Sequence, residues 1–212
     1  MKPTHLKLLE SHLNSLRILG SEEIESFISK VKLRKFRKNE YLIKEGEISS
    51  ELIFVTKGIF RTYFTPSQGS VVTYGFTFEN NFLAAYSSFI TQKESGENIQ
   101  AVVNSEAFII AKDQLEQLAN QYPGWTRFLK IYSEQQYLHM ERLLKRVYQE
   151  NAETRYVRLI KNQPHYFQHL PLNHIASYLG ITQRHLSRIR KGIMVKEMED
   201  SKNGKKPSSS PN

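Results

Sequence analysis

The spacing of apolar residues changes twice along the chain, and these changes limit the possible folds more than any other feature. Leucines three and four residues apart predict a helix before Gly20. From Val31 to Ile110 the spacing approaches two, in short runs such as ELIFVTKG and EAFIIA that are rich in β-branched and aromatic residues. After Lys112 the helical spacing returns. This order predicts the α+β class, with an antiparallel β-roll followed by helices.

The positive charge of the chain lies in its second part. The 212 residues have a formal net charge of +9, with 30 Lys and Arg against 21 Asp and Glu. Residues 1–121 contain 14 residues of each sign, whereas residues 122–212 contain 16 basic and 7 acidic residues. A neutral part joined to a basic part favours a protein that senses or assembles through one part and binds a polyanion through the other.

Several classes of protein are disfavoured by what the sequence lacks. The chain has no cysteine, which excludes disulfides, thiolate nucleophiles, zinc fingers and cysteine-bound iron–sulfur clusters. It has no nucleophile elbow, phosphate-binding loop or dinucleotide-binding motif, so we expect no enzymatic activity. His165 and His169 are spaced like metal ligands, but they follow Pro164 in a segment that we interpret as a connector, so we expect no metal site.

The sequence also gives an expectation for the location of the protein. No apolar run reaches the roughly 18–20 residues that a membrane span needs. The first residues, MKPTHLKLLE, lack the apolar core of a signal peptide. We therefore expect a cytoplasmic protein that does not enter a membrane.

The longest helical pattern extends from about Trp125 to Tyr148 and has two apolar rows. The first row repeats at the spacing of a coiled coil and consists of Leu129, Tyr132, Gln136, His139 and Leu143. The second row consists of Tyr137, Met140, Leu144 and Val147. Two rows predict two neighbours, the β-roll and a second helix. Because Gln136 and His139 suit a partly polar dimer axis, we predict that the first row forms a homodimer contact, with a core helix of one wide stripe as the alternative.

Residues 171–191 predict two short helices that meet at a glycine. Gly180 supplies the left-handed conformation of a sharp turn, and Thr182 is a good N-cap for the second helix. The apolar residues expected to face inward are Ile175, Ala176 and Leu179 on the first helix and Leu186 and Ile189 on the second. This pattern is typical of a helix-turn-helix.

The outward face of the second helix carries hydrogen-bond donors and cations. Such a helix fits the major groove of double-stranded DNA, where arginine pairs with guanine while hydroxyl groups and the helix N-terminus hold phosphates. The predicted DNA contacts are Thr182, Gln183, Arg184, His185, Ser187, Arg188 and Lys191. The alternative is a helical hairpin with a solvated basic face.

These segments resemble the Crp/Fnr family of bacterial transcription regulators over nearly the whole chain. YLIKEGEISSELIFVTKGIFRTYF is similar to the strand and glycine pattern of the family, and IASYLGITQRHLSRIRK is similar to its helix-turn-helix. The resemblance implies a cyclic-nucleotide-binding-like sensor roll with flanking helices at 1–123, a dimerisation helix at 124–150 and a DNA-binding domain at 151–195. It implies a homodimer on a near-palindromic DNA site, with RNA polymerase as a further candidate partner. The base-reading positions of the family fall on Gln183, Arg184 and Arg188.

The chain departs from the family where members hold a cyclic nucleotide. Those members bind the phosphate with a Gly-Glu pair and an Arg-Ser or Arg-Thr pair, whereas Ala84 and Ala85 stand here in place of Gly-Glu and no arginine occurs from Thr62 to Thr126. A buried phosphate needs a cationic partner, so the sequence argues against ordinary cyclic AMP binding and predicts no cofactor. The candidates for an effector pocket are Tyr74, Ala84, Ala85, Tyr86, Ser87 and Ser88, with ordinary roll core as the alternative.

A second departure lies at the C-terminus, where relatives have a two-stranded wing. The segment GIMVKEMEDSKNGKKPSSSPN has one brief apolar patch followed by Lys, Ser and Pro. We therefore expect the wing to be reduced or absent and residues 196–212 to be a disordered tail. Two alternatives to an effector-controlled regulator stay open, namely a small-ligand-binding adaptor without DNA contact and a DNA binder that needs no effector.

Overall fold

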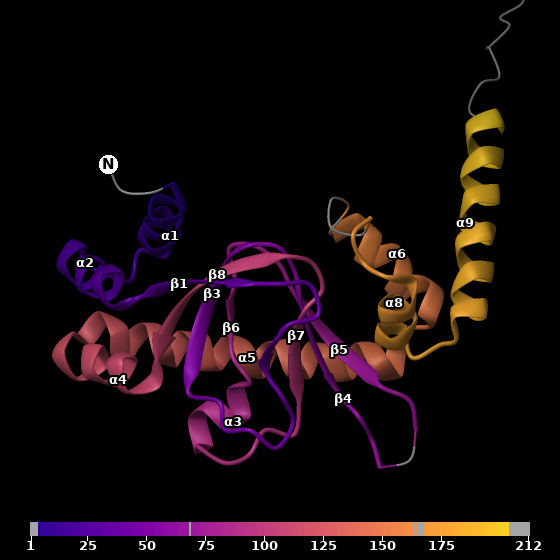
Figure 1. Cartoon of the computed structure of the whole chain (residues 1–212). Coiled ribbons are helices and arrows are strands. Elements are labelled where there is room, and N and C mark those ends of the chain that lie inside the picture. The colour runs from indigo at the N-terminus through magenta and orange to yellow at the C-terminus, as the bar shows by residue number, and fades with distance from the viewer. Residues whose placement is uncertain (1–3, 68, 163, 165–167, 204–212) are drawn as a thin grey trace, which may run out of the picture.

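A β-roll occupies the centre of the molecule, and helices from both ends of the chain cover it (Figure 1). The computed structural model describes residues 4–67, 69–162, 164 and 168–203. The first helices lie at one end of the roll, the last helices lie at the other end, and one long helix runs along the roll between them. This architecture confirms the predicted α+β class and the antiparallel roll.

The strands of the described residues form two four-stranded sheets in which all pairs are antiparallel. The strands are β1 (Lys32–Phe36), β2 (Tyr41–Ile43), β3 (Glu51–Lys57), β4 (Phe60–Phe64), β5 (Val72–Thr77), β6 (Phe82–Leu83), β7 (Asn98–Ala101) and β8 (Ser105–Ala111). One sheet has the order β1-β8-β3-β6 and the other the order β2-β7-β4-β5. The first strand, β1, pairs with the last strand, β8, so the roll is closed by segments that are far apart in the sequence.

Helices flank the roll before, within and after its strands. They are α1 (Thr4–Ser15), α2 (Ser21–Lys30), α3 (Tyr86–Thr91), α4 (Lys112–Gln121), α5 (Pro123–Gln149), α6 (Ala152–Asn162), α8 (Leu172–Leu179) and α9 (Gln183–Asn203). Pro123 occupies the first turn of α5, where its missing N–H removes no helical hydrogen bond. The short helix α3 lies between β6 and β7. The sequence does not predict it, because six residues are too few to show a helical period.

The two sheets enclose an apolar interior. Its buried side chains come from both sheets and include Phe36, Ile43, Ile53, Val55, Phe60 and Ile99. The rings of Phe36 and Phe60 meet edge to face, with centroids 5.1 Å apart. Each such side chain contributes roughly 1.5–3 kcal/mol when it leaves water, so this interior holds the roll closed.

A second cluster joins the N-terminal helices to the start of α5. Trp125 is fully buried there and stacks on Phe27 of α2 with ring centroids 4.5 Å apart. Glu23 of α2 fixes the same junction, because its side chain accepts the backbone N–H of Gly124 at 2.8 Å and its carbonyl accepts the indole N–H of Trp125 at 3.1 Å. A carboxylate at the first turn of α5 also complements the helix dipole. The direction of α5 along the roll therefore depends on α2.

A third cluster joins the C-terminal helices to the other end of the roll. Its members from the roll are Ile59, Phe78 and Val102. Its members from the C-terminal part are Leu170, which precedes α8, and the helical residues Tyr156, Ile175, Ala176, Leu179, Leu186 and Ile189. Ser177 of α8 adds two polar links, since it donates to the carbonyl of Val71 at 2.6 Å and accepts from the N–H of Thr73 at 2.9 Å. The helices α6, α8 and α9 thus share one core with the roll.

The structure corrects the predicted C-terminal boundary. Helix α9 continues to Asn203, so the expectation of a disordered tail is wrong for residues 196–203, whereas residues 204–212 lie outside the described part. Lys, Glu and Met are good helix formers, and no proline interrupts the segment after Lys191 until after the helix has ended. Gly192 costs the helix roughly 1 kcal/mol but does not end it. The described residues after Gly192 contain no strand.

We expect Gly58→Ala to destabilise the protein more than Gly46→Ala. Both glycines have left-handed backbone, with φ of 97° and 86°, and each alanine costs about 1–2 kcal/mol on that account. A Cβ on Gly58 would also lie 2.9 Å from the Cα of Ser105, whereas nothing lies within 4 Å of a Cβ on Gly46. The overlap adds roughly 1–3 kcal/mol. Urea unfolding, followed through the single tryptophan, measures both losses, and equal losses would contradict the close approach at Ser105.

Candidate functional site

The junction between α8 and α9 is built as the sequence predicts. Gly180 ends α8 with φ of 65°, in the left-handed region. The N–H of Ile181 donates to the carbonyl of Ala176 at 3.0 Å, which closes the end of α8. Thr182 caps α9, because its hydroxyl accepts the N–H of His185 at 3.2 Å. Two helices are therefore held at a fixed angle by a short, hydrogen-bonded turn.

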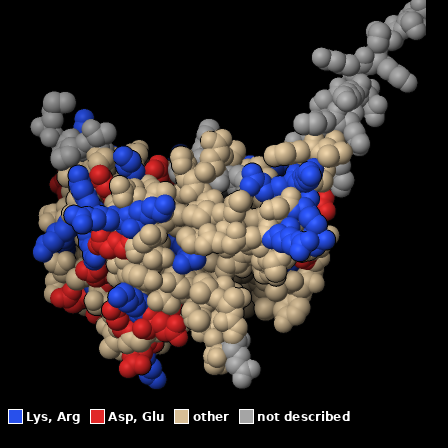
Figure 2. Space-filling view, turned by 45° about the vertical axis from the view of Figure 1, so that its right-hand side comes forward, with Lys and Arg blue, Asp and Glu red and all other residues tan. Residues whose placement is uncertain are grey.

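Helix α9 has one buried and one exposed face over its first two turns. Leu186 is fully buried and Ile189 is nearly so. The seven residues predicted to contact DNA are all exposed, namely Thr182, Gln183, Arg184, His185, Ser187, Arg188 and Lys191. Figure 2 shows Lys and Arg side chains gathered on the C-terminal helices at the right of the view, whereas basic and acidic side chains lie mixed at the left and few charged side chains lie between. The exposed face of α9 is thus available to a polyanion.

The structure places the predicted dimer row of α5 largely against its own chain. Tyr132 packs against Phe82 and Phe128, and Gln136 and His139 line a pocket of the roll. Leu129 and Tyr132 pack against the roll, and Gln136, His139 and Leu143 line pockets beside it, with His139 still exposed. A dimer contact through this row stays a prediction. The row exposed to solvent is the second one, in which Tyr137 is 71% and Leu144 58% exposed. Polar residues in the first row had suggested a dimer axis, but a polar pocket explains them equally well.

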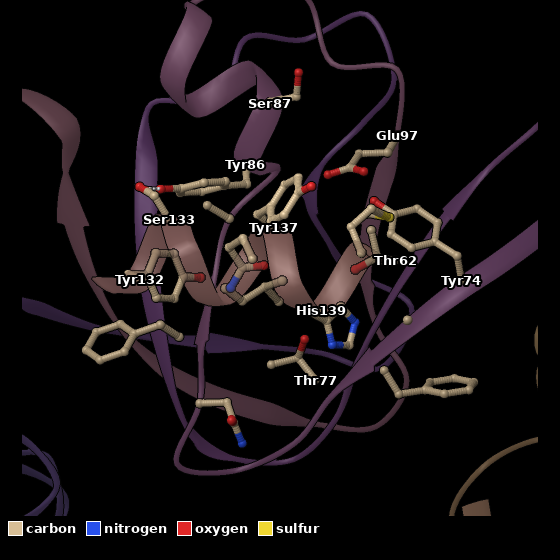
Figure 3. A pocket seen from close by; sticks show the side chains of 18 of the residues that line it. Thr62, Tyr74, Thr77, Tyr86, Ser87, Glu97, Tyr132, Ser133, Tyr137 and His139 are labelled. Carbon is tan, nitrogen blue, oxygen red and sulfur yellow. Dashed lines mark hydrogen bonds between the residues drawn. The ribbon is translucent and has the colours of Figure 1, made fainter. Parts of the chain in front are cut away.

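A cavity of about 700 Å³ lies between the roll and α5. It is lined by β4, β5, β6, α3 and the middle of α5 (Figure 3). Four of the residues predicted for an effector pocket line it, namely Tyr74, Ala84, Tyr86 and Ser87. The hydroxyl groups of Tyr86 on α3 and Ser133 on α5 lie 2.5 Å apart, which links two walls of the cavity.

Two of the predicted pocket residues, Ala85 and Ser88, do not line the cavity. Ala85 is 1% exposed and belongs to the interior between the sheets. The hydroxyl of Ser88 accepts the N–H of Ser49 at 2.9 Å and donates to the carbonyl of Lys93 at 2.5 Å. Both residues therefore contact the roll and the loops beside α3. A short helix presents only one of its faces to the cavity, and these two residues lie outside that face.

The sequence did not predict the remaining polar residues of the cavity wall. They are Thr62, Thr77, Asn81, Glu97, Ser133 and Tyr137, together with Tyr132, Gln136 and His139, which had been assigned to a dimer contact. Thr62 is buried on β4 together with its neighbours Arg61 and Tyr63, so the burial pattern of this strand does not single it out. Glu97 stands in the polar segment before β7, and no pattern in the sequence distinguishes it from the exposed carboxylates beside it.

Glu97 is the one carboxylate among the described residues that line the cavity, and none of these residues is Lys or Arg. Burial raises the pKa of Glu97 to about 7. Burial also lowers the pKa of His139, and the positive charges of Arg146 and Arg142 lower it further. At neutral pH the imidazole is therefore neutral, and the cavity contains little positive charge to hold an anion.

Residues 33–122 match the family model of the cyclic nucleotide-binding domain, so the roll has the sequence pattern of that domain. The family model covers the roll and not the C-terminal helices. The resemblance to Crp/Fnr regulators that the sequence predicts includes those helices, and a comparison with solved structures tests whether the whole fold agrees. No curated protein sequence matches the chain.

Three solved structures share the fold over most of their length. FixK2 from Bradyrhizobium japonicum matches with a TM-score of 0.69 at 16% identity, over 79% of this chain and 86% of that chain. The c-di-GMP-responsive global regulator CLP from Xanthomonas campestris matches with a TM-score of 0.66 at 16% identity, over 84% and 93%. A protein from Eubacterium rectale described as a candidate Crp/Fnr regulator matches with a TM-score of 0.66 at 14% identity, over 85% and 86%. The chain therefore has the fold of Crp/Fnr transcriptional regulators, as its sequence predicts.

Two other features of the described residues bear on possible functions. No described helix is long and apolar enough to cross a membrane. No three His, Asp or Glu residues of the described segments lie together as metal ligands. The pair His165 and His169 is described only in part, because His165 lies outside the described residues.

Replacing Glu97 with Gln is expected to remove one pH dependence of stability. Because the pKa of Glu97 is raised from 4.5 to about 7 by folding, the folded state binds an extra proton between these values. Its stabilisation is complete below pH 4.5 and is lost as the pH rises through 7. Urea unfolding between pH 4.5 and 8 should therefore show the wild type losing stability relative to Glu97→Gln as pH rises. A difference between the two proteins that does not change with pH would contradict the shifted pKa.

Proposed function

We propose that the protein is a transcription regulator of the Crp/Fnr type that binds a near-palindromic DNA site as a homodimer. The observation that carries the proposal is the exposed face of α9, on which cations and hydrogen-bond donors lie together while Leu186 and Ile189 hold the opposite face in the core. The shared fold supports the assignment, because the neighbouring structures include transcription regulators. We propose no enzymatic activity.

The geometry of α9 suits a helix that enters the major groove. Gln183 and Arg184 lie in its first turn, and Arg188 lies one turn further along the same exposed side. Arginine can donate two hydrogen bonds to guanine, which makes Arg184 and Arg188 the candidates for reading bases. Thr182 and the backbone N–H groups of the first turn would hold phosphates. The tight turn at Gly180 would transmit the position of α8 to this helix.

The homodimer is proposed to form through the exposed row of α5. Tyr137, Met140, Leu144 and Val147 are between 51% and 71% exposed, although they are apolar or aromatic. Their spacing of three and four residues is that of one side of a coiled coil. A parallel pair of α5 helices would present two copies of α9 to successive major grooves, about 34 Å apart. RNA polymerase stays a predicted partner of such a dimer.

Arg188→Ala is expected to weaken binding to the specific DNA site by about 1–3 kcal/mol and to relax the base preference at one position of each half-site. The site would be enriched from random-sequence DNA, and affinity would be measured by fluorescence anisotropy at several salt concentrations. Arg127→Ala is the matched control, because Arg127 is exposed near the start of α5, far from α9 (Figure 1). Unchanged base preference in Arg188→Ala would remove this residue from base reading.

Leu144→Glu is expected to convert the dimer to a monomer. A carboxylate in the centre of an apolar contact would lose its water without gaining a partner, so dimerisation should weaken by about 100-fold or more. Sedimentation equilibrium measures the change. Gln135→Glu adds the same charge on the opposite side of α5, at an exposed position, and should leave the dimer intact. A dimeric Leu144→Glu protein would show that the contact lies elsewhere.

A further inference from the structure

The cavity between the roll and α5 has the charge pattern of a site for a cation. Glu97 supplies a carboxylate, and the described lining residues supply no lysine or arginine. An anion in this place would leave water without a charge-assisted hydrogen bond, which is costly in a partly closed cavity. His139 does not change this balance, because burial and the nearby arginines lower its pKa and favour the neutral imidazole.

The carboxylate of Glu97 is left without a partner by its own chain. Its backbone forms hydrogen bonds with Ser95, but its side chain forms none with another described residue, and no described cation pairs with it. Glu97 is only partly exposed. Burial raises the pKa of the Glu97 carboxyl because it disfavours the charged carboxylate. A cation bound beside the carboxylate would stabilise its charge and offset this cost. The cavity thus has an unused anionic group on its wall.

Aromatic rings line the same cavity as this group. Figure 3 shows the carboxylate of Glu97 pointing into the cavity, with Tyr137 on one side and Tyr74 on the other. The other rings of the wall are Phe76, Phe78, Phe82, Tyr86 and Tyr132. The faces of aromatic rings attract cations, and cages of aromatic rings bind organic ammonium groups. The same rings would pack against an apolar or aromatic body.

We propose that this cavity binds an organic ammonium ion, with its charged nitrogen at Glu97 between Tyr74 and Tyr137 and its apolar body against the phenylalanines. The volume of about 700 Å³ is sufficient for a ligand of drug size. This assignment goes beyond the proposed function and is tested without DNA, so failure of DNA binding would leave it intact. In a regulator the bound ion would be the effector.

Calorimetry on the full-length protein tests the assignment with three ligands that share one ring system. Tryptamine carries an ammonium group, tryptophol a hydroxyl group and indole-3-propionate a carboxylate. We expect tryptamine to bind at least about tenfold more tightly than tryptophol. Indole-3-propionate and cyclic AMP should bind more weakly than tryptophol. Equal or tighter binding of either anion, or no binding of tryptamine at millimolar concentration, would overturn the proposal.

Variants separate the role of Glu97 from a general effect on the roll. Glu97→Gln should lower the affinity for tryptamine about tenfold while changing the affinity for tryptophol less than about threefold. Glu94→Gln removes an exposed carboxylate from the same segment and should change neither affinity. A loss of tryptophol binding equal to the loss of tryptamine binding in Glu97→Gln would indicate a merely structural role and would also overturn the proposal.

The pH dependence gives a second readout that a structural role would not produce. Tryptamine keeps its charge between pH 6 and 8, so its affinity should fall at pH 6, where Glu97 is largely protonated. The other titratable groups on the cavity wall are His139, Tyr132 and Tyr137 on α5, Tyr86 on α3 and Tyr74 on β5. Histidine is the side chain whose ordinary pKa lies near this range, and Glu97→Gln keeps His139, so the fall should disappear in that variant if Glu97 causes it. The same fall in Glu97→Gln would assign it to His139 and would contradict the role of Glu97.

Discussion

The packing of α5 against the open side of the roll determines where every functional surface lies. Residues of both its rows line the cavity, its outer row is largely exposed to solvent, and its last turn leads into the helices that carry the basic face. The start of α5 is fixed by Glu23 and by the stack of Trp125 on Phe27. Because α5 has 27 residues and its first turn is fixed, its orientation determines where the C-terminal helices lie at the other end of the roll.

The shared core at the far end of the roll gives the C-terminal helices a definite position. Leu186 and Ile189 of α9 belong to the same cluster as Ile59 and Phe78 of the roll. Ser177 adds hydrogen bonds across this contact, and the rings of Phe76 and Tyr178 lie 5.5 Å apart. Because Phe76 and Phe78 also line the cavity, a ligand there would touch residues that hold the basic helices in place. Communication between the two parts therefore has a short physical route.

The parts of the fold that the sequence predicts are those with a clear period or a specific backbone requirement. The strands of the roll, the length of α5, the turn at Gly180 and the cap at Thr182 are of this kind. The roles of the two rows on α5 could not be assigned, because both rows have coiled-coil spacing and only packing decides which row meets the roll. Glu97 could not be found either, because the sequence does not show which distant segments line the cavity together with it.

The position of Tyr137 and Met140 has a consequence for how the protein responds to its surroundings. Both residues line the cavity, and both are more than half exposed on the outer row of α5. A ligand in the cavity that orders these two side chains would therefore also change the exposed surface of α5 that a second copy would contact. Occupancy and self-association are then thermodynamically linked, each altering the equilibrium constant of the other by the same factor. The concentration of the protein itself would set its sensitivity to the ligand.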